Sequence, residues 1–293
     1  MPSEVHASKK IERYFLEIAW GAEYTQQMTQ AIRWLQNEIA DRMLQKLDIV
    51  KLDVKAALIV PAFPGKYLSA ITKRFPGTRI DSVYEDDLSG ISSLSFKASL
   101  FCRRVLNGAH SCSLEDYLKS GKLALPDNSV DFIFSDLLLQ DLSDPRHFLQ
   151  ECWRVLKEGG LLSFSYLGPD TGKELRSVDA DILKLKNLLS PWDMHDMGDA
   201  LLGERFSDPV MDMEFLNLGY ESDVLLLADA GALKLIESAP IKTLEKGLLP
   251  QKLTLEVVYG HAWAIGKQLA RVQDKLAYID VNQIGRKSRR DSA

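Results

Sequence analysis

The chain has 293 residues, 46% of them apolar and 26% charged, with a formal net charge of −5. This composition supports a packed core and excludes a disordered chain, and the negative charge argues against nucleic acid as the main partner. No apolar run approaches the length of a membrane span, and the first ten residues lack the apolar segment of an export signal. The three cysteines show no metal-ligand spacing. We therefore expect a cytoplasmic protein with no metal site and with neither membrane nor nucleic acid as a partner.

The first predicted elements are a helix and a buried strand. Residues Ile11–Leu47 contain no proline, and their apolar side chains recur every three or four positions, as in a helix. The short apolar run Ala56–Val60 predicts a strand. The next five residues, Pro61–Gly65, include two prolines, each of which removes a backbone N–H and fixes φ at about −65°.

A second helix and a second strand are expected at Lys66–Phe75 and Arg79–Tyr84. The strand ends in an acidic run, Glu85–Asp87. Strand ends collect Asp in solvated turns, so this run by itself does not indicate a binding site. Between Ser92 and Leu125 the pattern predicts only a short third strand and a helix.

The most regular part of the chain is a strand–helix–strand unit. Val130–Ser135 is rich in β-branched and aromatic residues and predicts a strand, and Pro145–Leu156 has apolar residues at helical spacing. We expect Gly159-Gly160 to end this helix and Leu161–Leu167 to form a strand buried on both faces. Short joints between these elements imply parallel pairing with a right-handed crossover.

Five further elements are expected in the order helix, helix, strand, helix and strand. They are Ser177–Leu189, Met197–Arg205 with Asp196 as its cap, Val210–Leu218, Leu225–Glu237 and Leu253–Tyr259. His195 and His261 flank two of these elements, and we interpret both as structural residues rather than general bases.

Several of these stretches resemble one family. The pattern VLKEGG before an apolar strand is similar to class I S-adenosylmethionine-dependent methyltransferases. Its continuation GPDTGKELR, at Gly168–Arg176, resembles the biotin-synthesis branch, the malonyl-acyl-carrier-protein O-methyltransferases. The stretches Leu35–Leu52, Ser190–Tyr220 and Glu256–Trp263 resemble the same branch, so the resemblance extends from about Leu35 to Lys287.

The resemblance implies a Rossmann-like α/β fold of the class I methyltransferases. This fold is a mostly parallel seven-stranded sheet with helices on both faces and added N-terminal and cap helices. Because the sequence has no internal repeat and no low-complexity linker, we also expect a single domain. Residues 1–50 would be an N-terminal helical extension, residues 51–170 the cofactor-binding half, and residues 171–293 the cap helices and last strands.

The resemblance also implies S-adenosylmethionine as cofactor, bound where the strands end. The matching positions are Pro61, Ala62, Phe63, Gly65, Asp87, Leu88, Asp136 and Leu137. Asp87 corresponds to the acidic residue that accepts hydrogen bonds from the ribose hydroxyls. Asp136 follows the fourth strand and could instead cap a helix. Glu115 and Asp116 lie near the adenine contacts of the family, or else in a solvated loop.

The chain departs from the family pattern at this site. The family has an acidic residue and a glycine-rich turn after its first strand, and glycine lets the backbone pass close to a ligand. Here the acidic position is Ile59, and Pro61 and Phe63 occupy two glycine positions. The ring of Phe63 would take the space of the methionine part of the cofactor. Other family residues are replaced at Thr29, Gln30 and Asp141.

The activity implied by the resemblance is methylation of the free carboxylate of malonyl-acyl-carrier protein. A carboxylate is already a nucleophile at neutral pH, so we expect alignment and desolvation of the reactants to provide most of the catalysis. We therefore assign no catalytic residue. Gly168, Asp170 and Thr171 are the candidate substrate contacts. Two alternatives remain: a non-catalytic relative that has lost the cofactor and acts as a binding or regulatory partner, and a different enzyme on the same scaffold.

Overall fold

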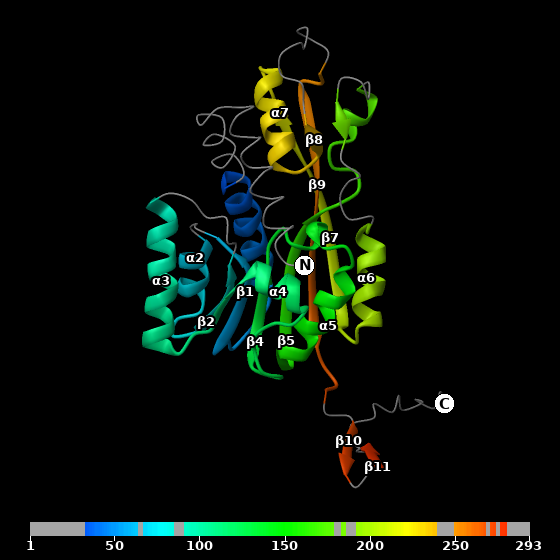
Figure 1. Ribbon diagram of the computed structural model, residues 1–293. Coiled ribbons are helices and arrows are strands. Elements are labelled where there is room, and N and C mark those ends of the chain that lie inside the picture. Colours follow the sequence, from blue (N-terminus) through cyan, green and yellow to red (C-terminus); the bar gives the residue numbers. More distant parts are fainter. Residues whose placement is uncertain are drawn as a thin grey trace, which may run out of the picture.

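The computed structural model describes residues 33–63, 67–84, 91–178, 183–185, 192–238, 249–267, 270–273 and 276–279. The main strands are β1 (Ala56–Ala62), β2 (Arg79–Tyr84), β3 (Ser111–Ser113), β4 (Val130–Ser135), β5 (Leu156–Leu167), β7 (Ser207–Gly219) and β9 (Lys252–Ala264). They form one seven-stranded sheet in the order β3-β2-β1-β4-β5-β9-β7 (Figure 1). β9 runs antiparallel to both of its neighbours, and the first five strands of this order are parallel. This sheet confirms the predicted Rossmann-like class I methyltransferase fold.

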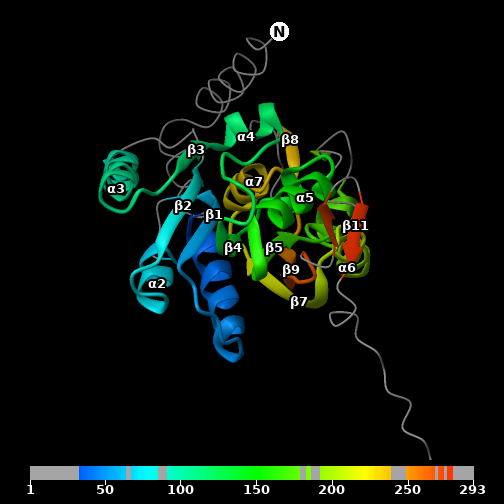
Figure 2. The same ribbon diagram turned by 90° about the horizontal axis from the view of Figure 1, so that it is seen from below.

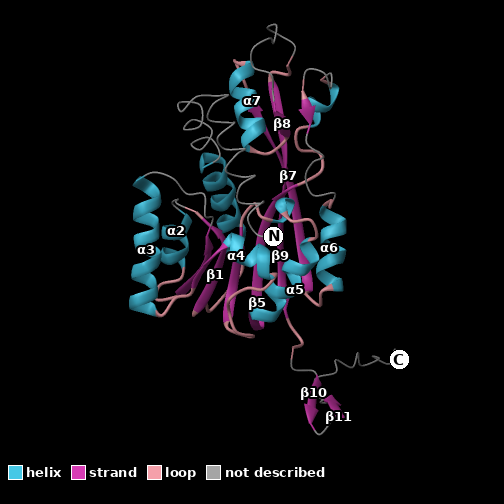
Figure 3. Cartoon of the chain, viewed as in Figure 1, coloured by secondary structure: helices cyan, strands magenta, loops and turns pink. Residues whose placement is uncertain are grey.

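The strand β1 lies in the interior of the sheet, beside β4. Ala57 pairs with Phe132, and Ile59 pairs with Phe134. Every residue of β1 is buried, because helices cover both faces of the sheet at this point (Figure 3). A strand buried on both faces is a continuous apolar run rather than an alternating one, which is the pattern of this segment.

Helices pack on both faces of the sheet. One apolar cluster joins the sheet to the helix of residues 33–46, to α2 (Tyr67–Arg74) and to α3 (Ile91–Asn107). A second cluster joins it to α4 (Leu114–Ser120), α5 (Pro145–Val155) and α6 (Met194–Gly203). Figure 2 shows α2 and α3 beside β1 and β2, with α5 and α6 over the other half of the molecule. The predicted helix Ile11–Leu47 is therefore confirmed in its second half, and residues 1–32 lie outside the described residues.

The smaller elements are α7 (Asp223–Ala232), β6 (Lys184–Leu185), β8 (Ile236–Ser238), the hairpin of β10 (Ala270–Gln273) and β11 (Leu276–Ile279), and the 3₁₀ turns η1 (Leu47–Ile49), η2 (Leu139–Asp141) and η3 (Lys173–Ser177). In Figure 1, α7 and β8 lie beyond one end of the sheet and the hairpin of β10 and β11 lies beyond the other. The helix α7 and β8 lie past the end of β7, which is also the end at which β1, β4 and β5 finish.

The glycine pair does not end α5, contrary to the prediction. The helix ends at Val155, and Leu156 already has extended backbone and opens β5. Gly159 and Gly160 lie inside β5, where the register against β4 shifts and Gly159 has φ +75°. The ammonium of Lys267 donates to carbonyl oxygens at the end of the helix, so a distant side chain satisfies groups that a glycine turn would otherwise satisfy.

Three later elements also differ from the predictions. The segment predicted as the helix Ser177–Leu189 contains β6, and only the short turn η3 precedes it; residues 179–182 and 186–190 lie outside the description. The cap of α6 is Asp193 and not Asp196, which is the third helical residue of a capping box. α7 ends at Ala232, because the apolar residues after it enter β8 and pair with β6.

Two features are absent from the described part of the chain. No helix there is long and apolar enough to cross a bilayer. No group of three or more His, Cys, Asp or Glu side chains there has the geometry of a metal site. Cys152 is a buried thiol, and Cys102 and Cys112 are more accessible; none of the three forms a disulfide.

A pair of isoleucine truncations should separate the core from the surface. Ile59 in β1 is fully buried, whereas Ile49 is 92% exposed. We expect Ile59→Ala to lower the free energy of unfolding by about 2–5 kcal/mol and Ile49→Ala to change it by less than about 0.5 kcal/mol. Urea unfolding followed by circular dichroism measures both, and equal effects would contradict the position of β1.

Candidate active site

The carboxyl ends of β1, β4 and β5 meet at one edge of the sheet. In open α/β sheets, ligands bind in the crevice outside these ends. Phe63 follows β1, Asp136 follows β4, and Gly168 follows β5. The fold therefore brings together the predicted cofactor and substrate positions of three segments that are far apart in sequence. Gly65, Asp87 and Leu88 lie outside the described residues, as do Thr29 and Gln30.

Two aromatic side chains fill the end of β1. Pro61 and Ala62 are buried within the strand, and Phe63 is only 2% exposed. The backbone N–H of Phe63 donates to the hydroxyl oxygen of Tyr67 over 2.7 Å. The two rings lie 4.5 Å apart between centroids, and Tyr67 stacks on Phe134 at 6.2 Å. The first backbone donor after β1 is thus already satisfied by the chain itself.

Asp136 is a buried carboxylate at the end of β4. It is 1% exposed, and Ser165 Oγ donates to its Oδ1 over 2.6 Å. Its other oxygen, Oδ2, has no hydrogen-bond partner among the described residues. Asp136 caps no described helix, which excludes the alternative interpretation from the sequence. Burial raises the pKa of this carboxyl to about 7, although the bond from Ser165 opposes the shift.

Leu137 holds a left-handed backbone next to Asp136. Its φ is +52°, and its N–H donates to both the carbonyl and the hydroxyl oxygen of Ser165 at 3.1 Å. The hydroxyl of Ser165 therefore accepts from Leu137 and donates to Asp136, which fixes both residues against β5.

The loop after β5 is tied to β9. The N–H of Gly168 donates to the carbonyl of Glu256 over 2.8 Å, and the N–H of Asp170 donates to the Glu256 carboxylate over 2.6 Å. The N–H of Glu256 in turn donates to Thr171 Oγ1 over 3.0 Å. One strand residue therefore holds all three predicted substrate contacts, Gly168 and Asp170 by their backbone N–H groups and Thr171 by its hydroxyl.

Glu256 and Ser165 are two of the site residues that the sequence interpretation missed. Both are polar residues within otherwise apolar buried strands, and that is the signal that could have found them. A buried polar side chain in such a strand needs a partner, and here the partners are the loop at Gly168 and the carboxyl of Asp136.

Other candidate residues have structural positions. Asp116 lies in the first turn of α4, where its N–H donates to the capping hydroxyl of Ser113. His195 is exposed at the start of α6. His261 is buried in β9, 3.3 Å from Ser163 Oγ, and burial lowers its pKa to about 4. Asp141 pairs with Lys234 at 2.6 Å on the surface. These contacts agree with the structural interpretation of both histidines.

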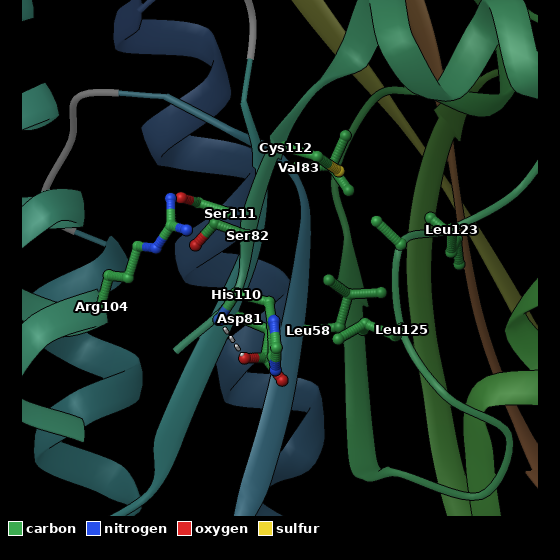
Figure 4. Close-up of a pocket in the computed structure, with 11 residues that line it drawn as sticks. Leu58, Asp81, Ser82, Val83, Arg104, His110, Ser111, Cys112, Leu123 and Leu125 are labelled. Atoms are coloured by element: carbon green, nitrogen blue, oxygen red, sulfur yellow. Dashed lines mark hydrogen bonds between the residues drawn. The ribbon is translucent and has the colours of Figure 1, made fainter. Parts of the chain in front are cut away.

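Two cavities lie outside the crevice. One of about 110 Å³ lies by β2 and β3, where Arg104 extends toward Ser82 and Ser111 (Figure 4). The carboxylate that lines this cavity, that of Asp81, is already paired with Arg79 at 2.9 Å. The other, of about 310 Å³, lies between the helix of residues 33–46, the end of β7 and α7, and its walls include Trp34. Neither cavity is lined by a predicted cofactor residue.

Known methyltransferases resemble this chain in sequence. A family model described as a methyltransferase domain matches residues 95–164. The malonyl-[acyl-carrier protein] O-methyltransferase of Gallionella capsiferriformans is 33% identical over 249 residues, which cover 78% of this chain and 83% of the relative. Its counterpart named malonyl-[acyl-carrier protein] O-methyltransferase 1 in Coxiella burnetii is 36% identical over 245 residues, 77% of this chain and 79% of the relative.

The chain belongs to the malonyl-[acyl-carrier protein] O-methyltransferase family. Among solved structures, the YcgJ protein of Bacillus subtilis aligns with a TM-score of 0.51 at 14% identity, covering 78% of this chain and 98% of that one. At this identity the alignment supports the fold alone. The membership makes this chain an S-adenosylmethionine-dependent O-methyltransferase by class, as the sequence resemblance predicts.

The end of β1 does not fit the methyl donor of this family in the conformation described. The Phe63 ring fills the strand end, and the hydroxyl of Tyr67 already accepts its N–H. The end of β4 differs, because the unpartnered Oδ2 of Asp136 could accept a hydrogen bond from a ligand. Among the described strand ends, the disagreement is thus at β1 and not at β4.

The buried carboxyl of Asp136 should make stability fall as pH rises. Its folded pKa, about 7, lies above its ordinary value of 3.8, so the native state retains a proton that the unfolded chain releases. Its contribution is present below about pH 4 and is lost as pH rises through about 7. We expect this group to cost the wild type roughly 2–3 kcal/mol between pH 5 and pH 8.

Asp136→Asn should remove that part of the pH dependence while keeping an acceptor for Ser165. Urea unfolding at pH 5 and pH 8 measures the difference for each protein. Asp199→Asn, at an exposed position of α6, is the matched control and should behave as the wild type. A pH dependence that is unchanged in Asp136→Asn would contradict the buried proton.

Gly168 should not tolerate a side chain. A Cβ at this position would lie 2.5 Å from the carboxyl carbon of Glu256, which the loop itself holds in place. We expect Gly168→Ala to lower the free energy of unfolding by about 1–3 kcal/mol. Gly203→Ala, where no atom lies within 4 Å, is the control and should cost nothing. Chemical denaturation measures both, and a neutral Gly168→Ala would disprove the close contact.

Proposed function

We propose that this chain methylates the free carboxylate of a malonyl group carried on acyl-carrier protein, a step in biotin synthesis. The observation that carries the proposal is membership of the malonyl-[acyl-carrier protein] O-methyltransferase family across about four-fifths of the chain. The methyl group would come from S-adenosylmethionine. The product would be a methyl ester, which removes the charge from the acyl group.

The chemistry of the acceptor agrees with the residues at the strand ends. A carboxylate at neutral pH is already a nucleophile, so the chain needs to hold and desolvate it rather than remove a proton. Asp136, with its pKa raised to about 7, is partly uncharged near neutrality and repels an anionic acyl group less than an ordinary aspartate does. No described group is required to act as a general base.

Gly168, Asp170 and Thr171 remain the proposed substrate contacts. Their support is that Glu256 holds all three, Gly168 and Asp170 by their backbone and Thr171 by its hydroxyl. The carboxylate of Asp170 is half exposed and lies 3.7 Å from Lys173. A fixed loop at the carboxyl end of β5 is a suitable wall for an extended substrate arm. The cofactor contacts proposed from the sequence, including Asp87, Leu88 and Gly65, rest on the resemblance.

An acidic carrier protein would need a basic surface, and the ends of α2 and α3 offer one. Lys73 and Arg104 are exposed there, and Arg103 reaches Thr72 of α2 over 3.4 Å, which places the two helix ends side by side. Charge complementarity steers such an encounter despite the net charge of −5. Arg74 is less available, because it is already bonded to Asp48.

We also propose one domain with the divisions expected from the sequence, 1–50, 51–170 and 171–293. A single sheet that includes strands from both larger parts supports it. The proposed location is the cytoplasm, in keeping with three free cysteines.

Methyl transfer to defined acyl-carrier proteins tests the proposal. With S-adenosylmethionine as donor, malonyl-carrier protein should gain one methyl group by mass spectrometry. Acetyl-carrier protein, which lacks the free carboxylate, is the matched control and should gain none. Growth without biotin, restored in a strain that lacks its own malonyl-carrier-protein methyltransferase, would confirm the pathway.

Donor binding without transfer to malonyl-carrier protein would leave the fold but reject the substrate. No donor binding at millimolar concentration would instead favour the alternative, a non-catalytic family member that acts as a binding or regulatory partner.

A further inference from the structure

The cavity of about 110 Å³ beside β2 and β3 contains a buried hydroxyl group that has no partner. Ser82 is 2% exposed, and its Oγ makes no hydrogen bond within the described part of the chain. An unpaired buried hydroxyl costs free energy, so such a group usually faces an ordered water or a ligand. The cavity is therefore a candidate binding site, and its lining includes none of the predicted cofactor or substrate residues.

Strand register places a second hydroxyl beside the first. Ser82 of β2 is opposite Ser111 of β3 in parallel pairing, so the two side chains leave the sheet on the same face. Arg104 reaches the same cavity from α3, and Figure 4 shows its guanidinium group directed at both hydroxyls. Three groups that can donate hydrogen bonds thus converge from three separate elements.

The charge of this cluster favours an anion. The carboxylate of Asp81 is already saturated, because its Oδ2 accepts from Arg79 over 2.9 Å and its Oδ1 accepts from the N–H of His110 over 2.8 Å. Arg79 balances the charge of Asp81, whereas Arg104 has no hydrogen bond or ion pair with a described residue. A guanidinium group offers paired N–H donors that match two oxygens of one oxyanion.

The size of the cavity limits the ligand. Its volume of about 110 Å³ is well below the roughly 300–1,000 Å³ of pockets that hold drug-sized molecules. Its opposite wall is apolar and consists of Leu58, Leu123 and Leu125 (Figure 4). A small oxyanion therefore suits this cavity, and a nucleotide or an acyl arm does not.

We propose that Arg104, Ser82 and Ser111 form a binding site for one small oxyanion, of which inorganic phosphate is the representative. The guanidinium group holds two oxygens of the anion, and the two hydroxyls donate to the others. The bound anion joins α3 to the edge of the sheet, so it stabilises the folded chain increasingly as its concentration rises. The site is separate from the crevice and does not depend on the proposed methyl transfer.

Titration with inorganic phosphate, followed by calorimetry and by thermal unfolding, tests the site. Sodium chloride at equal ionic strength is the salt control. The wild type should bind one phosphate, and its Tm should rise beyond the effect of chloride. Arg104→Gln should lower phosphate affinity at least about tenfold, because it removes a charged donor of hydrogen bonds. Lys97→Gln removes one positive charge from an exposed position of the same helix and should bind as the wild type does.

Ser82→Ala gives a readout that a structural hydroxyl would not give. Because this hydroxyl has no partner without the anion, its removal should not lower the free energy of unfolding in chloride. Phosphate affinity should nevertheless fall about three- to tenfold. This variant also keeps the test decisive if Arg104→Gln does not fold, and circular dichroism confirms the folded state of each variant.

Acetate at the same ionic strength separates a planar from a tetrahedral oxyanion, and binding of either one that depends on Arg104 supports the site. Three results would overturn it. They are no binding beyond the effect of chloride, equal phosphate affinity in Arg104→Gln and the wild type, and a loss of stability in Ser82→Ala that is the same with and without phosphate. A crystal structure in phosphate should place the anion within hydrogen-bond distance of Arg104, and phosphate found only elsewhere, as an adventitious ion only, would also reject the site.

Discussion

Backbone pairing of β1 with β4 determines where everything else in the crevice can lie. Ala57 opposite Phe132 and Ile59 opposite Phe134 fix the two strands in parallel register. Both strands are buried on both faces, so a slip of one residue would reverse the packing of every side chain. The same register places the ends of the two strands together. The buried ring of Phe63 and the buried carboxyl of Asp136 therefore lie at the same edge of the sheet.

The edge of the sheet satisfies most of its own polar groups. Glu256 bonds the loop at Gly168, Ser165 bonds Asp136, and Tyr67 bonds the end of β1. Such internal partners replace the water or ligand that open strand ends usually hold. The exceptions at the end of β4 are one carboxylate oxygen of Asp136 and the hydroxyl of Ser135, neither of which has a hydrogen-bond partner among the described residues. The crevice is therefore closed on the β1 side and incompletely satisfied on the β4 side.

Periodicity made the centre of the fold predictable. The apolar runs of β1, β4 and β5 and the helical spacing of α5 are local patterns, and the mostly parallel seven-stranded sheet followed from the family resemblance. The glycine pair at Gly159 was misinterpreted because glycine serves a strand irregularity as well as a helix end. The extent of α7 could not be read locally, since its following residues pair with β6 instead.

The site was less predictable, because its decisive contacts join distant segments. The departure at Phe63 is visible in the sequence, but the partner that holds it, Tyr67, is not, since a tyrosine four residues later has many possible roles. Glu256 acts on residues more than eighty positions earlier, and only its charge within an apolar strand marks it. The predicted contacts at Gly65, Asp87 and Leu88 remain predictions, outside the described residues.

The antiparallel strand β9 lies between β5 and β7, although it follows both in the chain. During synthesis, β5 and β7 therefore leave the ribosome with no partner on their facing edges until residues Lys252–Ala264 arrive. The loop after β5 cannot take its final shape before then, because Glu256 is not yet present. The acceptor side of the crevice is thus assembled only after β9 has been translated, and a chain interrupted before β9 would expose two unpaired strand edges to aggregation.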